Sequence, residues 1–154
     1  MTARELQHDV AEDLREMFKH DLYKTPTDGT SPPNVFKQFL PKLESDDEDD
    51  PFPYIIVRVD SGGIDSQTDP HKVALILVIG IYDDDTQNQG HATVLEIIER
   101  IQQHYEETPA LAEFVFTDPF GWALQDEETY PYYYGAVNLT FNAPAPRTKA
   151  SDLV

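Results

Sequence analysis

The segment from His71 to Asp83, HKVALILVIGIYD, constrains the fold more than any other part of the chain. Side chains alternate between the two faces of a β-strand. One face would carry Val73, Leu75, Leu77, Ile79 and Ile81, and the other Ala74, Ile76, Val78, Gly80 and Tyr82. Because both sets are apolar, we expect this strand to need cover on both sides.

Four further segments have the composition of strands. YIIVRVD, from Tyr54 to Asp60, is rich in β-branched residues and leads into a glycine-rich loop at 60–70 between paired strands. Glu113–Asp118 and Tyr130–Phe141 complete the pattern, with 119–129 as their connection, and Val35–Leu40 is a candidate short strand.

Two amphipathic helices are predicted. The first runs from Arg4 to Leu22, with Thr2 and Glu5 as a capping box. In the second, Asn88 is the candidate N-cap and Glu96 pairs with Arg100 one turn later. Its apolar stripe consists of Val94, Leu95, Ile98, Ile101 and Tyr105.

This order predicts a single α+β domain over residues 1–143, with one antiparallel or mixed sheet of four to five strands and both main helices packed on one face. Lys24–Asn34 and an acidic segment at 45–53 read as loops, and the tail 144–154 as mobile. Two helices cover only one side of such a sheet. A partner surface, or long loops of the same chain, would cover the other side, and the sequence favours neither.

Charge and composition exclude several function classes. With 11 basic and 29 acidic side chains, the net charge of −18 opposes binding to nucleic-acid phosphates or to an anionic membrane. The absence of cysteine excludes disulfides, thiolate zinc sites and thiol catalysis. The charged N-terminal segment and the lack of long apolar runs predict a soluble protein made in the cytoplasm.

The aspartates Asp83, Asp84 and Asp85 raise the question of a metal loop. An EF-hand needs glycine at its sixth position and glutamate at its twelfth, where this chain has Asn88 and Val94. We therefore interpret the aspartates as a turn before a helix. The acidic residues of the 60–70 loop also have the composition of a turn. The five histidines lack the HxH or HExxH spacing of metal ligands, and the chain has no G-x-S-x-G nucleophile motif and no phosphate-binding loop. We expect no metal, no cofactor and no enzymatic activity.

Aromatic residues are concentrated between Phe120 and Tyr134. Tyrosine and tryptophan combine a large apolar area with a polar group, and they are common at interfaces. We expect Tyr133 and the apolar residues that alternate with it to face the helices. The candidate residues for a subunit or partner interface are Phe120, Trp122, Tyr130, Tyr132 and Tyr134.

The succession PYIIVRV, VALILVIGIYDDD, TQNQGH, ATVLEIIERIQQHY, FVFTDPFGW and YPYYYGAVNLTF resembles the tail terminator, or tail-completion, proteins of long-tailed bacteriophages and prophages. The resemblance covers about Pro53 to Ala143 and rests on element order and these short phrases.

The resemblance implies a non-enzymatic structural protein of the virion tail, assembled in the host cytoplasm. Such a protein forms a homo-oligomeric ring, commonly a hexamer, that caps the tail tube and joins it to the head connector protein. DNA would pass through the ring without specific binding. The acidic candidates for residues that line the lumen or face the tube are Asp46, Asp47, Asp49, Asp50, Asp83, Asp84 and Asp85.

Two alternatives remain at the level of sequence. One is another head-tail joining or neck protein of the same class. The other is an acidic DNA mimic that inhibits a DNA-binding protein, which the net charge of −18 suggests. A mimic needs carboxylates spread along one face, whereas here they cluster in loops, so we favour the tail terminator.

Overall fold

The fold is described from a computed structural model, which describes residues 2–42 and 51–143. Its two helices are α1 (Ala3–Phe18) and α2 (His91–Glu107). Its strands are β1 (Tyr23–Thr25), β2 (Gly29–Ser31), β3 (Asn34–Lys37), β4 (Tyr54–Gly63), β5 (His71–Tyr82), β6 (Ala110–Leu111), β7 (Phe114–Leu124) and β8 (Tyr132–Ala143).

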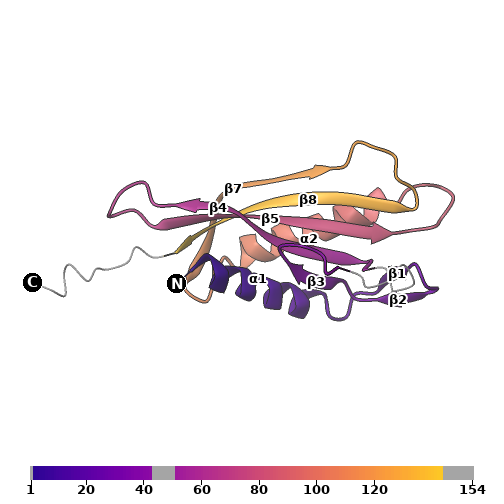
Figure 1. The fold of residues 1–154 in the computed structure, drawn as a ribbon, viewed down its shortest axis with the longest axis horizontal. Coiled ribbons are helices and arrows are strands. Elements are labelled where there is room, and N and C mark those ends of the chain that lie inside the picture. Colours follow the sequence, from indigo (N-terminus) through magenta and orange to yellow (C-terminus); the bar gives the residue numbers. More distant parts are fainter. Residues whose placement is uncertain (1, 43–50, 144–154) are drawn as a thin grey trace, which may run out of the picture.

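Six of these strands form one curled, mixed sheet in the order β3-β4-β5-β8-β7-β6. Only β3 and β4 run parallel, and the other neighbours are antiparallel. The central pair, β5 and β8, is in register along its whole length, from His71 opposite Ala143 to Tyr82 opposite Tyr132. In Figure 1 these two strands run side by side through the middle of the molecule, and the separate β1-β2 hairpin lies at one end.

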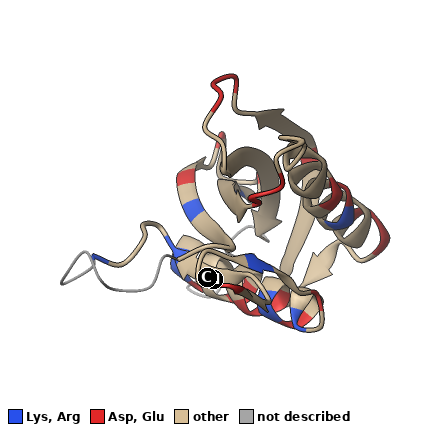
Figure 2. Cartoon of the chain, turned by 90° about the vertical axis from the view of Figure 1, so that its right-hand side faces the viewer, with Lys and Arg blue, Asp and Glu red and all other residues tan. Residues whose placement is uncertain are grey.

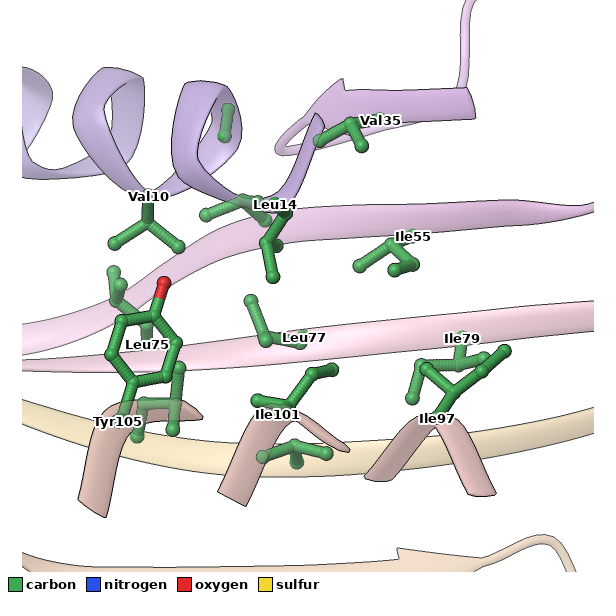
Figure 3. Close-up of a cluster of buried hydrophobic side chains, with 14 of the residues drawn as sticks. Val10, Leu14, Val35, Ile55, Leu75, Leu77, Ile79, Ile97, Ile101 and Tyr105 are labelled. Carbon is green, nitrogen blue, oxygen red and sulfur yellow. The ribbon is translucent and has the colours of Figure 1, made fainter. Parts of the chain in front are cut away.

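Both helices pack on the same face of the sheet, α1 against β3 and β4, and α2 against β5, β7 and β8. Figure 3 shows Val10 and Leu14 of α1 approaching the sheet beside Ile97 and Ile101 of α2. They meet the first of the two predicted faces of β5, whose five apolar residues are all at most 2% exposed. This layer is the hydrophobic core.

Polar contacts join α2 to α1 and to the residues that follow α1. His104 of α2 lies 2.8 Å from Asp13 of α1. Arg100 forms an ion pair with Asp21, and its guanidinium stacks 4.7 Å from the centroid of the Phe18 ring. The sequence predicted that Arg100 pairs with Glu96 within α2. In the structure Arg100 instead connects α2 to the end of α1 and the residues after it.

The α+β class, the mixed sheet and the two helices are confirmed, whereas the predicted strand number is wrong. The sheet has six strands, and β1 and β2 form a second, two-stranded sheet that begins at Tyr23 and otherwise lies inside the predicted loop Lys24–Asn34. Asp28 adopts a left-handed φ of 63° just before Gly29, as a tight hairpin turn requires. Strands of two to four residues have too few positions to show an alternating pattern.

Several predicted boundaries also differ. Helix α1 begins after Thr2, whose hydroxyl accepts from Glu5 N–H, but it ends at Phe18 and leaves Leu22 61% exposed. Helix α2 has Gly90 as its N-cap, and Asn88 instead has a left-handed φ of 57°. Strand β4 takes in the first residues of the predicted 60–70 loop, and β7 continues through much of the predicted 119–129 connection. The tail 144–154 and residues 45–50 of the acidic loop lie outside the described residues.

The contact between α2 and β8 depends on a glycine. A Cβ atom on Gly135 would lie 2.6 Å from Val94 Cγ1 of α2, closer than real carbon contacts allow. We expect Gly135→Ala to lower the free energy of unfolding by about 1–3 kcal/mol through overpacking. Urea unfolding monitored by circular dichroism measures this effect.

Gly63→Ala is the matched control, because a Cβ on Gly63 in strand β4 would meet nothing within 4 Å. We expect its urea midpoint to stay at or slightly above that of the wild type, since alanine restricts the unfolded chain. Equal losses in the two variants would contradict the close approach of α2 to β8.

Candidate functional site

The face of the sheet opposite the helices, called the open face here, carries the second predicted set of β5 residues. The register places Val78 between Ile56 of β4 and Ala136 of β8, and Ala136 next to Ala123 of β7. Val78 and Ala136 are half-buried and Ala123 is exposed. Together with Tyr134 they border an open, apolar groove of about 450 Å³. Apolar surface therefore continues across three strands on the side away from the helices.

A cluster of aromatic rings, called the tyrosine cluster here, occupies one end of the open face. Phe52 is at its centre, with ring centroids 4.9 Å from Tyr54, 4.7 Å from Tyr132 and 5.9 Å from Tyr134. Tyr82 joins through Tyr132 at 5.7 Å. Offset and tilted aromatic contacts of this kind stabilise beyond the area they bury. The cluster holds its rings in fixed positions at the surface.

Gly80 of β5 makes room for the tyrosine cluster. Tyr54 stands directly opposite Gly80 in the ladder between β4 and β5. A Cβ on Gly80 would lie 2.4 Å from two carbons of the Tyr54 ring, so the ring rests on the bare backbone. Tyr54 is consequently only 5% exposed, although it lies on the face that the helices do not cover.

Burial also determines the chemistry of the cluster's hydroxyl groups. Burial, followed by the nearby Tyr134, raises the pKa of Tyr54 to about 12. The pKa of Tyr82 is raised in the same direction, first by burial and then by Asp84. These phenols stay protonated at neutral pH, so they can donate hydrogen bonds but do not act as bases.

The predicted aspartates form a turn at the same end of the sheet. Asp83 accepts from Asp85 N–H at 3.1 Å, and Asp85 accepts from Gln87 N–H at 2.9 Å. Lys24 of the β1-β2 hairpin lies 3.0 Å from Asp83 and 3.5 Å from Asp84. The hydrogen bond with Asp83 is the main cause that raises the pKa of Lys24. These carboxylates therefore order the turn and attach the hairpin.

The five predicted aromatic interface residues do not form one patch. Tyr132 and Tyr134 lie in the tyrosine cluster, as the alternation on β8 indicates. Phe120 packs towards the core beside Phe116, with centroids 6.2 Å apart. Trp122 pairs with Val137, a core residue, and so lies on the helix side at the edge of the sheet, where it is 50% exposed.

Tyr130 lies outside the sheet, in the connection before β8. It is 41% exposed and donates a hydrogen bond to the backbone oxygen of Asp84 at 2.6 Å. The acidic candidates Asp46, Asp47, Asp49 and Asp50 lie outside the described residues.

Sequence reasoning missed Phe52 and Tyr54 as parts of the surface. The sequence held one signal of this contact. Tyr54 begins one strand and Gly80 lies near the end of the next, so an antiparallel pairing of the two strands can place them opposite each other. Only the strand register brings them together.

The described residues show neither a metal cluster nor a membrane span. Within 2–42 and 51–143, no three histidine, aspartate or glutamate side chains converge in a way that could hold a metal ion. Neither α1 nor α2 is long and apolar enough to cross a bilayer. The comparisons with known proteins gave no match to a protein-family model or to a curated protein. The shape and chemistry of the surface therefore carry the functional argument.

The buried phenol predicts a specific loss of stability in alkali. The unfolded chain releases the Tyr54 proton near pH 10.0, whereas the folded protein retains it to about 12. The unfolded state is therefore favoured increasingly as the pH rises between these two values, and the stabilising difference is present below pH 10. Tyr23, whose pKa burial also raises to about 12, adds to the same trend.

We expect Tyr54→Phe to make this alkaline decline shallower, because phenylalanine keeps the ring contacts and has no proton to release. Urea midpoints measured from about pH 8 to about pH 11.5 provide the test, with the values near pH 8 as the baseline for each protein. A decline as steep as in the wild type would contradict the burial of the Tyr54 hydroxyl.

Proposed function

We propose that the chain is a structural subunit of a homo-oligomeric ring, acting as the tail terminator that closes a phage tail tube and joins it to the head connector protein. One observation carries the proposal. The sheet buries one face under its two helices and presents a second, apolar and aromatic face that the helices leave open. Surface of this kind is typical of a contact between protein subunits.

The chemistry of the open face suits association between proteins. The groove around Val78 and Ala136 offers apolar contact area, and the phenols of the tyrosine cluster supply hydrogen-bond donors at its margin. Aromatic rings already fixed by their neighbours lose little conformational entropy when a partner covers them.

A closed ring follows when the open face meets a different surface of the next copy and the rotation between copies closes. The resemblance to tail terminators supports this geometry and a hexamer in particular. The proposed place of the protein is the virion tail, with assembly in the host cytoplasm and the tail tube protein as the second partner. A neck protein would use the same surface, and only the identity of the bound neighbour separates the two.

The acidic character fits a ring through which DNA passes. A lumen with excess negative charge does not retain phosphates, so DNA moves through it without binding. At the described end of β5, Asp83 and Asp84 share the single cation Lys24, so the turn keeps excess negative charge. We propose these residues for the lumen or for the face towards the tube.

The mass of the protein in solution tests the ring. We expect light scattering behind a sizing column to show a species of five to seven subunits at high protein concentration or after addition of purified tail tubes, and negative-stain images to show closed rings. The proposal would be contradicted, and the DNA mimic favoured, if the protein remained monomeric even after addition of tail tubes and inhibited a DNA-binding enzyme.

Ala136→Lys tests whether the open face is the contact. A lysine at the centre of the groove places a charge in the surface that would be buried, so we expect at least a tenfold loss of the assembled species. The side chain is only half-buried in the single chain, so the melting temperature should change by less than about 4 °C.

Gln103→Lys is the matched control. It makes the same change of charge on the exposed side of α2, away from the open face. We expect this variant to assemble as the wild type does. Equal losses in both variants would assign the effect to overall charge and not to the groove.

A further inference from the structure

The two edges of the sheet differ in how far their backbone groups are bonded to side chains of the same chain. At the β3 and β4 edge, three side chains bond to the strand backbone. Arg15 donates to Val35 O at 2.7 Å, and Gln7 donates to Val57 O at 2.8 Å. The Gln38 amide both donates to Val59 O, at 3.2 Å, and accepts from Val59 N–H, at 2.9 Å. Arg15 thus occupies an outward group of β3, and Gln7 and Gln38 occupy backbone groups of β4 at or beyond the end of β3. Side chains of the same chain therefore partly protect this edge against pairing.

At the other edge, β6 pairs only with Phe114 and Val115 at the beginning of β7. A bulge between Thr117 and Gly121 follows, and it contains Pro119. Beyond the bulge, Gly121–Leu124 pairs with β8 on one side. No other strand of the described residues lies along its second side.

The register identifies the backbone groups that point outwards. Gln125 N–H donates to Tyr134 O at 3.1 Å. Hydrogen-bonded pairs alternate along an antiparallel ladder, so Ala123 and Gly121 also face β8. The N–H and C=O groups of Trp122 and Leu124 therefore point away from the sheet. Such an edge can accept an extended segment by β-strand addition.

The side chain at this edge is the only tryptophan of the protein, Trp122, and it is 50% exposed. An exposed tryptophan beside unpaired strand backbone is unusual, because natural edges are commonly protected by charge or proline. Buried tryptophans are among the residues that contribute most to binding. The one proline of β7, Pro119, lies within the bulge, so Gly121–Leu124 contains no proline.

Carboxylates stand at both ends of the open edge. Asp126, Glu127 and Glu128 follow β7, and Asp118 precedes its regular part. None of the four forms an ion pair with another of the described residues. Figure 2 views the molecule from the end that carries the connection after β7 and shows acidic residues in that projecting connection. A segment that lies along this edge would meet negative charge at each end.

These charges indicate which kind of segment can pair with the β7 edge. Two copies pairing by their β7 edges in antiparallel fashion would bring Asp118 of each copy towards the acidic connection of the other, with mutual repulsion. The β3 edge of another copy is short, four residues long, and is partly protected by its own side chains. We propose that the edge Gly121–Leu124 binds an extended segment of a different protein, with an apolar residue against Trp122 and lysine or arginine residues towards Asp126 and Glu127.

This site adjoins the open face, because Ala123 borders the groove with its side chain, but it uses the outward backbone of β7 and the Trp122 ring on the helix side. It goes beyond the proposed function, because it does not require the ring. The probes are two fluorescein-labelled peptides with the same alternating valine and threonine centre, one flanked by lysine pairs and the other by glutamate pairs. Fluorescence anisotropy with the full chain measures their binding. We expect the lysine-flanked peptide to bind at least about tenfold more tightly than the glutamate-flanked one.

Three variants locate the binding. Trp122→Pro removes an outward N–H and the indole without breaking a bond to β8, and we expect at least a tenfold loss of affinity. Trp122→Phe keeps the N–H and a ring, and its affinity should stay within about threefold of wild type. The double change Asp126→Lys and Glu127→Lys should remove the preference for the lysine-flanked peptide. Circular dichroism confirms that each variant is folded.

Failure of both peptides to bind, or equal binding of the two, would overturn the proposal. So would equal affinities of Trp122→Pro and Trp122→Phe. A loss of binding in Ala136→Lys with none in Trp122→Pro would assign the peptide to the open face instead. Ring formation by Trp122→Pro, measured by light scattering, reports on the proposed function separately.

Discussion

The ladder between β5 and β8 aligns Leu77 with Val137 on the helix side and Val78 with Ala136 on the open face. One register therefore fixes two apolar layers at once. A slip by a single residue would exchange the layers and place half-exposed side chains under the helices. The helices, the tyrosine cluster and the free edge of β7 are all positioned by this pairing, because β4 and β7 build outwards from β5 and β8.

The long elements could be predicted because their patterns repeat. The alternation from His71 to Asp83 and the stripes of the two helices were sufficient to predict that the helices cover one face of the sheet, but not whether loops of the same chain cover the other. The short hairpin strands and β6 could not be predicted in this way. Strand β7 was cut short because Pro119 and Gly121 look like a turn, whereas the structure absorbs them in a bulge. That bulge spans four residue steps on β7, from 117 to 121, against two on β8, from 140 to 138.

The candidate surface was predicted only in part for the same reason. Alternation on β8 placed Tyr132 and Tyr134 on the face opposite Tyr133. The pattern assigned no face to Trp122, since its side of the sheet depends on the course of the chain through the bulge. Phe52 and Tyr54 belong to the cluster through a contact with Gly80 that joins two strands. Such a contact depends on register, which a single strand's pattern does not contain.

The net charge of −18 has opposite consequences for contacts at the open face and at the β7 edge. Copies of so acidic a chain repel one another, so the association that we propose between copies has to come from apolar area, which the open face offers. Salt screens the repulsion and favours such association. The β7 edge has the opposite electrostatics, because a basic segment is attracted to its carboxylates and salt weakens that attraction. If both proposals hold, an acidic chain with one apolar face and one acid-flanked edge separates contacts with its own copies from contacts with other proteins by the sign of their response to salt.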